Sequence, residues 1–142
     1  MKLTNVKNAK RGMTLLELTV VILVLLSLIS ILFVGVRAWK QGADRSQSIM
    51  TIRNAQQAIR GIQNMQAANP GDTVAALDTQ VFGNTGAEYI NTGLAPGTVP
   101  THPATGVTFG FHAGGATVLP AVSTTYITSD DAAYNPTDTT GW

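Results

Sequence analysis

The 142-residue sequence contains no cysteine, and that absence excludes several kinds of site. The chain can have no disulfide bond, no thiolate metal ligand and no cysteine nucleophile. Charged residues are also scarce, at 12% of the chain compared with about a quarter in ordinary soluble domains. The length allows one small domain with an extension, but not two full domains.

Basic residues are absent after Arg60. All nine Lys and Arg residues lie before Gly61, and four of them are among the first twelve positions. Residues 61–142 carry six acidic residues and no basic one. Because nucleic-acid binding needs clustered cations that face phosphates, this distribution predicts no nucleic-acid partner.

Recognisable catalytic motifs are missing as well. His102 and His112 are ten residues apart without the H-E-x-x-H spacing, so both are predicted to be exposed or strand histidines that bind no metal. The sequence has neither a P-loop nor a G-x-S-x-G motif. We therefore predict that the protein is not an enzyme and has no organic cofactor.

One long apolar segment is present near the start of the chain. Residues 18–36 (LTVVILVLLSLISILFVGV) carry no charge, and as a helix they would measure about 28 Å, close to the ~30 Å hydrocarbon core of a membrane. The four basic residues before it favour a cytoplasmic N-terminus, while Arg37, Trp39 and Lys40 suit the outer interface. We predict a single transmembrane helix, with the rest of the chain outside the cytoplasm.

This segment has two simpler interpretations, a secretory signal peptide and a plain single-pass anchor. A secretory signal peptide has an apolar run of about 7–15 residues followed by a small-x-small cleavage site. Here the run is longer, and residues 37–40 (RAWK) make a poor cleavage site. A plain single-pass anchor explains the hydropathy equally well and stays open.

A single acid lies at the start of the apolar segment, in residues 11–17 (RGMTLLE). Thr14 and Glu17 have the spacing of a capping box, which satisfies free amides at the start of a helix. A carboxylate in a membrane segment costs up to about 2.5–3.5 kcal/mol at mid-depth and less near the ends. Glu17 is therefore expected to cap the helix and also to have a charged partner.

Residues 10–18 (KRGMTLLEL) and the apolar tail that follows resemble the processing signal of type IV prepilins and pseudopilins. In that family a membrane peptidase cuts after the glycine and usually methylates the new first residue. The resemblance implies cleavage after Gly12, with Met13 as the mature N-terminus and residues 1–12 as a basic leader peptide. It also implies that Glu17 guides assembly by neutralising the terminal amine of a neighbouring subunit.

The resemblance implies partners and a location too. The partners are copies of the chain, other pilin-like subunits, the prepilin peptidase and an inner-membrane assembly platform. The chain is expected in the bacterial inner membrane with a periplasmic headpiece, and then in a periplasmic or extracellular filament. The lack of cysteine and the small headpiece favour a type II secretion pseudopilin; a type IV pilus pilin and a monomeric membrane-anchored binding module stay open.

The first helix is predicted to extend well beyond the membrane. No proline precedes Pro70, so we predict one helix over residues 13–68, capped by Asn69. Many relatives carry a proline where this chain has Val34, and Gly35 leaves open whether the helix melts in a filament. An apolar stripe marks the second half of the helix: Ile49, Ile52, Ala55, Ile59 and Ile62.

Residues 69–142, called the headpiece here, are rich in Gly and Thr and end in an acidic segment. The predicted fold is α+β and pilin-like, with the long helix packed on a small antiparallel sheet. The expected elements are a helical turn at 72–77, a loop at 81–98, strands at 106–112, 116–119 and 122–128, a hairpin turn at Gly114-Gly115, and a mobile or neighbour-bound tail at 129–142.

A calcium site is a further possibility that the resemblance raises. Major pseudopilins of type II secretion systems bind calcium near the C-terminus through acidic residues and loop carbonyls. Asp130, Asp131 and Asp138 are weak candidates for such a site here, because carboxylates suit a hard cation. Their spacing is not that of an EF-hand, and a solvated acidic tail is the alternative.

Overall fold

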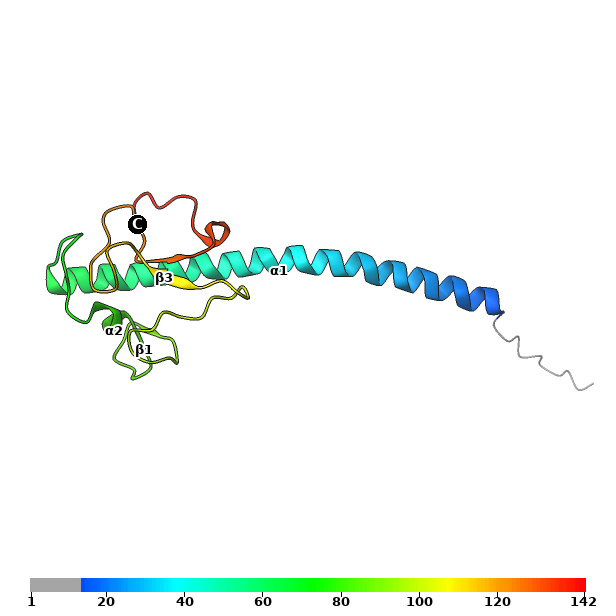
Figure 1. Cartoon of the computed structure of the whole chain (residues 1–142), viewed down its shortest axis with the longest axis horizontal. Helices are drawn as coiled ribbons and strands as arrows, with labels where there is room; N and C mark the ends of the chain where they lie inside the picture. Colours follow the sequence, from blue (N-terminus) through cyan, green and yellow to red (C-terminus); the bar gives the residue numbers. More distant parts are fainter. Residues whose placement is uncertain (1–13) are drawn as a thin grey trace, which may run out of the picture. The chain divides into compact units, whose positions relative to one another are not determined.

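The computed structural model describes residues 14–142 and has the predicted α+β fold, in which a long helix packs against small sheets (Figure 1). Helix α1 (Leu15–Gln66) has 52 residues. The shorter elements follow in the order α2 (Leu77–Val81), β1 (Phe82–Gly83), β2 (Ile90–Asn91), β3 (Phe109–Phe111), β4 (Ile127–Ser129) and the 3-10 turn η1 (Ala132–Tyr134). The chain divides into two compact units between Trp39 and Lys40, and α1 contributes residues to both.

Helix α1 is continuous, as expected for a segment without proline. Gly35 and Gly42 both lie inside it, although each costs about 1 kcal/mol relative to alanine in a helix. The surrounding residues are mostly Leu, Ile, Val, Ala and Gln, and tertiary packing in the second half adds stability that propensity alone does not give. The two glycines therefore do not interrupt the helix.

The helix ends earlier than predicted, in a Schellman motif. Ala67 takes the left-handed conformation with φ of 50°, and the N–H of Ala68 donates to the C=O of Gln63 at 3.1 Å. The prediction that Asn69 caps the helix was wrong, because the closing turn is complete before Asn69 is reached. The N–H of Asn69 instead donates to Asp72 Oδ2 at 2.7 Å.

The predicted isoleucine stripe forms the helical side of the core. Ile52 and Ile59 are fully buried, Ile62 is nearly so, and Ile49 is half-buried. These residues recur every three or four positions, so they lie on one face of α1. The buried headpiece side chains in the same cluster come from α2, β1, β3, β4 and the loops between them: Val74, Leu77, Val81, Phe82, Phe109, Leu119, Tyr126 and Ile127.

The headpiece contains two two-stranded sheets rather than one antiparallel sheet. Strands β3 and β4 pair antiparallel, with Phe109 opposite Ser129, and they overlap the predicted strands at 106–112 and 122–128. Strands β1 and β2 pair in parallel within the segment 81–98, which was predicted to be a loop. That prediction was wrong because two-residue strands carry too little sequence to show a period.

Two further predictions for the headpiece were wrong. The segment 116–119 is not a strand: Val118 makes an isolated antiparallel bridge to Thr73, so no hairpin forms across Gly114-Gly115. The helical turn expected at 72–77 is replaced by α2, which starts at the last of those residues. Thr73 and Val118, which lie in these two segments, pair although they are distant in sequence. The turn residues near each segment therefore did not indicate the structure that forms.

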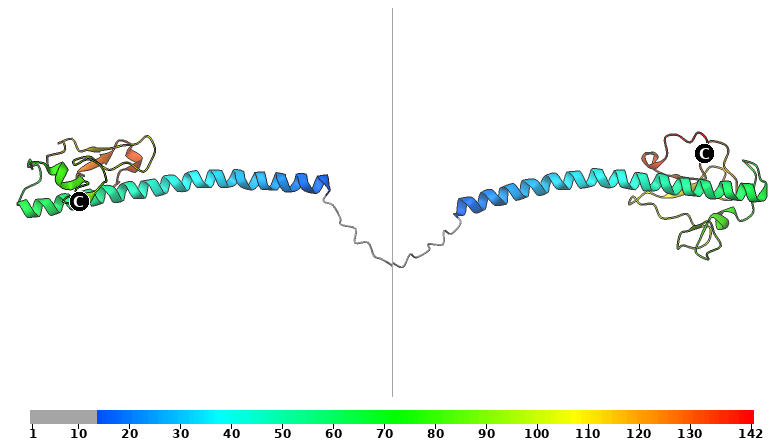
Figure 2. Two further views of the ribbon diagram at one scale, coloured as in Figure 1. Left: turned by 90° about the horizontal axis from the view of Figure 1, so that it is seen from below. Right: turned by 180° about the vertical axis from the view of Figure 1, so that it is seen from behind.

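The final segment, residues 129–142, was predicted to be mobile or bound to a neighbour. It packs on its own unit, and its binding to a neighbour stays a prediction. Asp131 caps η1 by accepting a backbone N–H at 2.9 Å, and the Tyr134 C=O accepts from Ser48 Oγ at 3.1 Å. Trp142 packs against the edge of the core. The left view of Figure 2 shows the headpiece along one side of the second half of α1.

Replacing Ile59 by alanine tests this core. Ile59 is fully buried, so Ile59→Ala is expected to lower the free energy of unfolding by about 2–5 kcal/mol. Met50 is exposed on the same helix, so Met50→Ala is the control and should change stability by less than about 0.5 kcal/mol. Urea unfolding of the full chain in detergent, followed by near-UV circular dichroism, measures both. Equal stability of the two variants would contradict the assigned core.

Candidate assembly surface

Helix α1 begins with the predicted capping box. The N–H of Glu17 donates to Thr14 Oγ1 at 3.2 Å, and the N–H of Thr14 donates to Glu17 Oε2 at 3.0 Å. The Thr14 hydroxyl lies 3.2 Å from the same carboxylate oxygen. These reciprocal bonds satisfy two amides at the helix start and confirm the local role predicted for Glu17.

The capping box engages only one oxygen of the Glu17 carboxylate. All the hydrogen bonds to this side chain within residues 14–142 go to Oε2, and over the same residues Glu17 forms no ion pair. Its side chain is exposed. Oε1 is therefore available to a cationic group from outside the described part of the chain, while Oε2 holds the cap.

Residues 18–36 of α1 form an exposed surface without charge that is made mostly of apolar side chains. Every residue from 15 to 39 is exposed, and this is the one helix among residues 14–142 that is long and apolar enough to cross a membrane. Two of its hydroxyls bond back to the helix: Thr19 Oγ1 donates to the Leu16 C=O at 2.9 Å, and Ser30 Oγ donates to the Leu26 C=O at 2.8 Å. Such a surface must be covered by lipid or by other apolar helices.

The processing residues Gly12 and Met13 lie outside the described residues. The described residues begin at Thr14, directly after the predicted mature N-terminus. The predicted cut after Gly12 therefore stays a prediction. The capping box at Thr14 and Glu17 belongs entirely to the predicted mature chain.

Both histidines are at least partly buried. His102 is buried in a loop, where the Ala104 N–H donates to Nδ1 at 3.0 Å, so the proton of the neutral ring is on Nε2. Nε2 lies 3.2 Å from Ser48 Oγ on α1 and 3.4 Å from Ser129 Oγ on β4. This polar cluster ties three distant segments together, and the prediction of an exposed or strand position for His102 was wrong.

His112 directly follows β3 and is half-buried. Its Nε2 lies 2.8 Å from the Val118 C=O, and its Nδ1 accepts the Gly114 N–H at 3.1 Å. Both ring nitrogens of His112 are thus used within the turn that follows the strand. Its position next to β3 agrees with the predicted strand setting, and its hydrogen bonds give it a structural role.

The three calcium candidates are each held in a separate local turn. Asp130 accepts the Thr108 N–H at 3.0 Å, Asp131 caps η1, and Asp138 accepts the Thr140 N–H at 2.8 Å. Over residues 14–142 no three His, Asp or Glu side chains form a group that could hold a metal ion. The calcium site stays a prediction that this geometry does not support.

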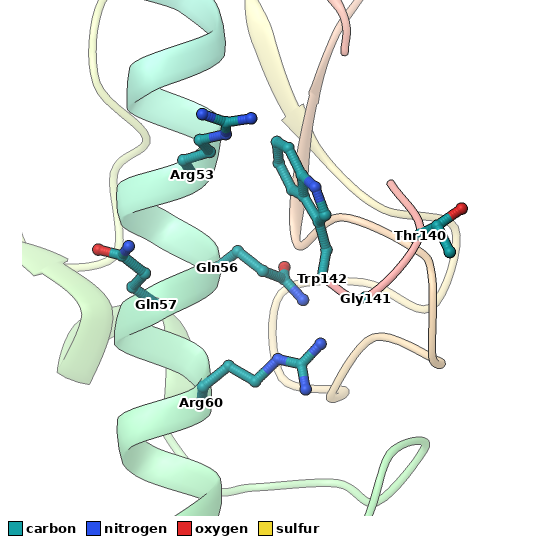
Figure 3. A pocket seen from close by; sticks show the side chains of 7 residues that line it. All are labelled: Arg53, Gln56, Gln57, Arg60, Thr140, Gly141 and Trp142. Atoms are coloured by element: carbon teal, nitrogen blue, oxygen red, sulfur yellow. The ribbon is translucent and has the colours of Figure 1, made fainter. Parts of the chain in front are cut away.

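A groove opens between the second half of α1 and the end of the chain (Figure 3). Its volume is about 620 Å³. Arg53 and Arg60 both point towards it, and the Arg53 guanidinium lies 5.1 Å from the centre of the Trp142 ring. The sequence interpretation missed this groove, although two arginines seven residues apart on a helix share one face.

Comparison of the chain with protein-family models, with curated proteins and with solved structures gives no match. The geometry of α1 and of the headpiece is therefore the basis for a functional proposal. That geometry establishes an exposed apolar helix near the N-terminus, followed by small sheets packed on the same helix.

Lowering the pH tests the role of Asp130 in holding the headpiece. Hydrogen bonds from the backbone and the hydroxyl of Thr108 hold the pKa of Asp130 below its ordinary value. A lowered folded-state pKa gives stability that is complete above the unfolded pKa and is lost as the pH falls through the folded pKa. Asp130→Asn should therefore melt at a lower temperature than the native chain at pH 7, and this difference should shrink as the pH falls below about 3.9, the ordinary pKa of an aspartate. Thermal melts across that range measure it; a difference that does not change with pH would contradict the assignment.

Proposed function

We propose that this chain is a structural subunit of a type IV-type filament and not an enzyme. In this proposal the chain is cut after Gly12 and assembles through the apolar surface of α1. The proposal extends to a type II secretion pseudopilin, with a type IV pilus pilin as the nearest alternative. Copies of the same chain, other pilin-like subunits, the prepilin peptidase and an inner-membrane platform are its proposed partners.

The observation that carries the proposal is a free carboxylate oxygen at the start of a long, uncharged and mostly apolar helical segment. Glu17 is the only acid between Thr14 and Ala43, and its Oε1 accepts no hydrogen bond in the described residues. A mispaired charge on a surface that packs against other apolar helices is expensive. One amine from a neighbour would satisfy Oε1 and would fix the register between two helices.

The apolar surface supplies the driving force for such packing. Burying one Leu, Ile or Val side chain contributes about 1.5–3 kcal/mol, and residues 15–36 are mostly of these types. In a membrane lipid covers this surface, and in a filament neighbouring helices replace the lipid. The same surface on a monomeric anchor needs lipid only, which makes Glu17 and its free oxygen dispensable.

Conservative changes at the helix start separate the cap from the assembly role. Glu17→Gln keeps a side chain that can close a capping box but removes the charge. Thr14→Ala removes the hydroxyl of the cap but keeps the carboxylate. We expect Glu17→Gln and Glu17→Ala to abolish filament formation, and Thr14→Ala to retain most of it. Filaments sheared from cells that carry the full assembly machinery, detected by immunoblot, measure all three.

The same three variants at Glu17 and Thr14 provide the controls and the outcomes that would contradict the proposal. Each variant should accumulate in the membrane and lose its leader at the native rate, so any loss reflects assembly. If Glu17→Ala forms filaments as well as the native chain, the assembly role of Glu17 is wrong. If Gln at this position supports assembly and Thr14→Ala does not, Glu17 acts only as a helix cap.

A further inference from the structure

The basic and acidic residues of the 40–142 unit are separated along the chain. All its basic residues lie on α1, whereas six of its seven acidic residues lie in the headpiece. Among residues 14–142 the one ion pair joins Lys40 Nζ to Asp44 Oδ2 at 3.3 Å. This leaves Arg45, Arg53 and Arg60 without a carboxylate partner in the described structure.

Two of these three arginines face the groove. Arg53 and Arg60 are exposed, and by helical rise their Cα atoms are about 10.5 Å apart along α1. No guanidinium N–H of either residue donates to a protein acceptor within residues 14–142, so each keeps its full set of donors. Figure 3 shows both side chains on the Trp142 side of α1, while Gln57 points away from it.

The groove is built to hold these donors in place. Between the arginines lies Gln56, whose Oε1 accepts the Tyr126 N–H at 3.0 Å and whose Nε2 donates to the Thr124 C=O at 3.4 Å. The Trp142 ring limits the movement of Arg53 through a cation–π contact at 5.1 Å. The lining is polar and cationic with one aromatic ring, which suits carboxylates better than an apolar ligand.

We propose that this groove receives Asp130 and Asp131 from the headpiece of a second copy of the chain. The proposal rests on the proposed filament function, because it assigns the contact between neighbouring headpieces. Charge complementarity supports this occupant: the headpiece offers six carboxylates and no competing cation. Arginine and tryptophan are also the residues most enriched at the centres of protein interfaces.

Asp130 and Asp131 are the one pair of neighbouring acidic residues in the headpiece. They are adjacent, both are exposed, and the other four headpiece acids are isolated in sequence. Asp130 is fixed by Thr108, and Asp131 is fixed as the cap of η1. Fixed carboxylates lose little side-chain freedom on binding, so they are suited to bidentate contact with guanidinium groups.

The absence of cysteine makes this contact directly testable. One tagged full-length copy carries Thr140→Cys, at an exposed position that lines the groove, and a second, differently tagged copy carries Ala132→Cys beside Asp131. Both are expressed in cells with the assembly machinery, and a thiol-reactive crosslinker is added to their membranes. We expect a heterodimer, at a yield well above that of a control pair in which Ala87→Cys replaces Ala132→Cys.

Charge reversal shows whether the arginines are responsible. Arg60→Glu in the first copy should lower the heterodimer yield by about fivefold or more, because like charges then face each other. Arg45→Glu makes the same charge reversal on the same helix but outside the groove, and it should leave the heterodimer yield unchanged. Asp131→Arg in the second copy should restore part of the yield lost with Arg60→Glu.

Each contrary outcome has a distinct meaning. A heterodimer yield no higher than the Ala87→Cys control, or one that Arg60→Glu does not lower, overturns the proposed contact. If Asp131→Arg restores none of the yield, the groove binds a partner other than Asp131, and the proposed contact is also overturned. Copies with Leu28→Cys report on the apolar helices: if they crosslink while the groove pair does not, only this proposal fails. If they do not crosslink either, the filament function fails with it.

Discussion

The rest of the structure depends on the exposed apolar surface of the first part of α1. Residues 18–36 carry no charge, and every side chain there is exposed, so this half of the helix contributes nothing to the core of its own chain. At about 25 cal/mol per Å² of apolar surface, only lipid or other apolar helices can cover it at a favourable free energy. In the proposed filament, the carboxylate of Glu17 at the start of this surface would set the register between neighbouring helices.

The second half of α1 has a different role: it packs against the small headpiece and stabilises it without disulfide bonds. Ile52, Ile59 and Ile62 give the helical side of the core, and the polar cluster of His102 and Ser48 adds hydrogen bonds between distant segments. One helix thus joins an apolar surface to a folded unit whose basic residues lie on α1 and whose acidic residues lie mostly in the headpiece. A subunit that repeats along a filament needs both kinds of contact.

The predictable features were those encoded by local patterns. The apolar run, the capping box and the isoleucine stripe each depend on residues within a few turns of one helix, so periodicity and spacing were sufficient. The strands β1 and β2 and the burial of His102 were missed, because each depends on partners that no local period marks; Ser48, for example, is 54 residues from His102. The groove was missed for the same reason: it exists only because Trp142 folds back towards Arg53.

The central claim is that the chain is processed and then assembled through α1, and the state of its N-terminus tests this most directly. The measurement is the intact mass and N-terminal sequence of the protein taken from membranes of cells with an active prepilin peptidase. Our account predicts a chain that starts at Met13, with or without an added methyl group. A chain that still starts at Met1 under these conditions would contradict it and would favour a simple membrane-anchored module.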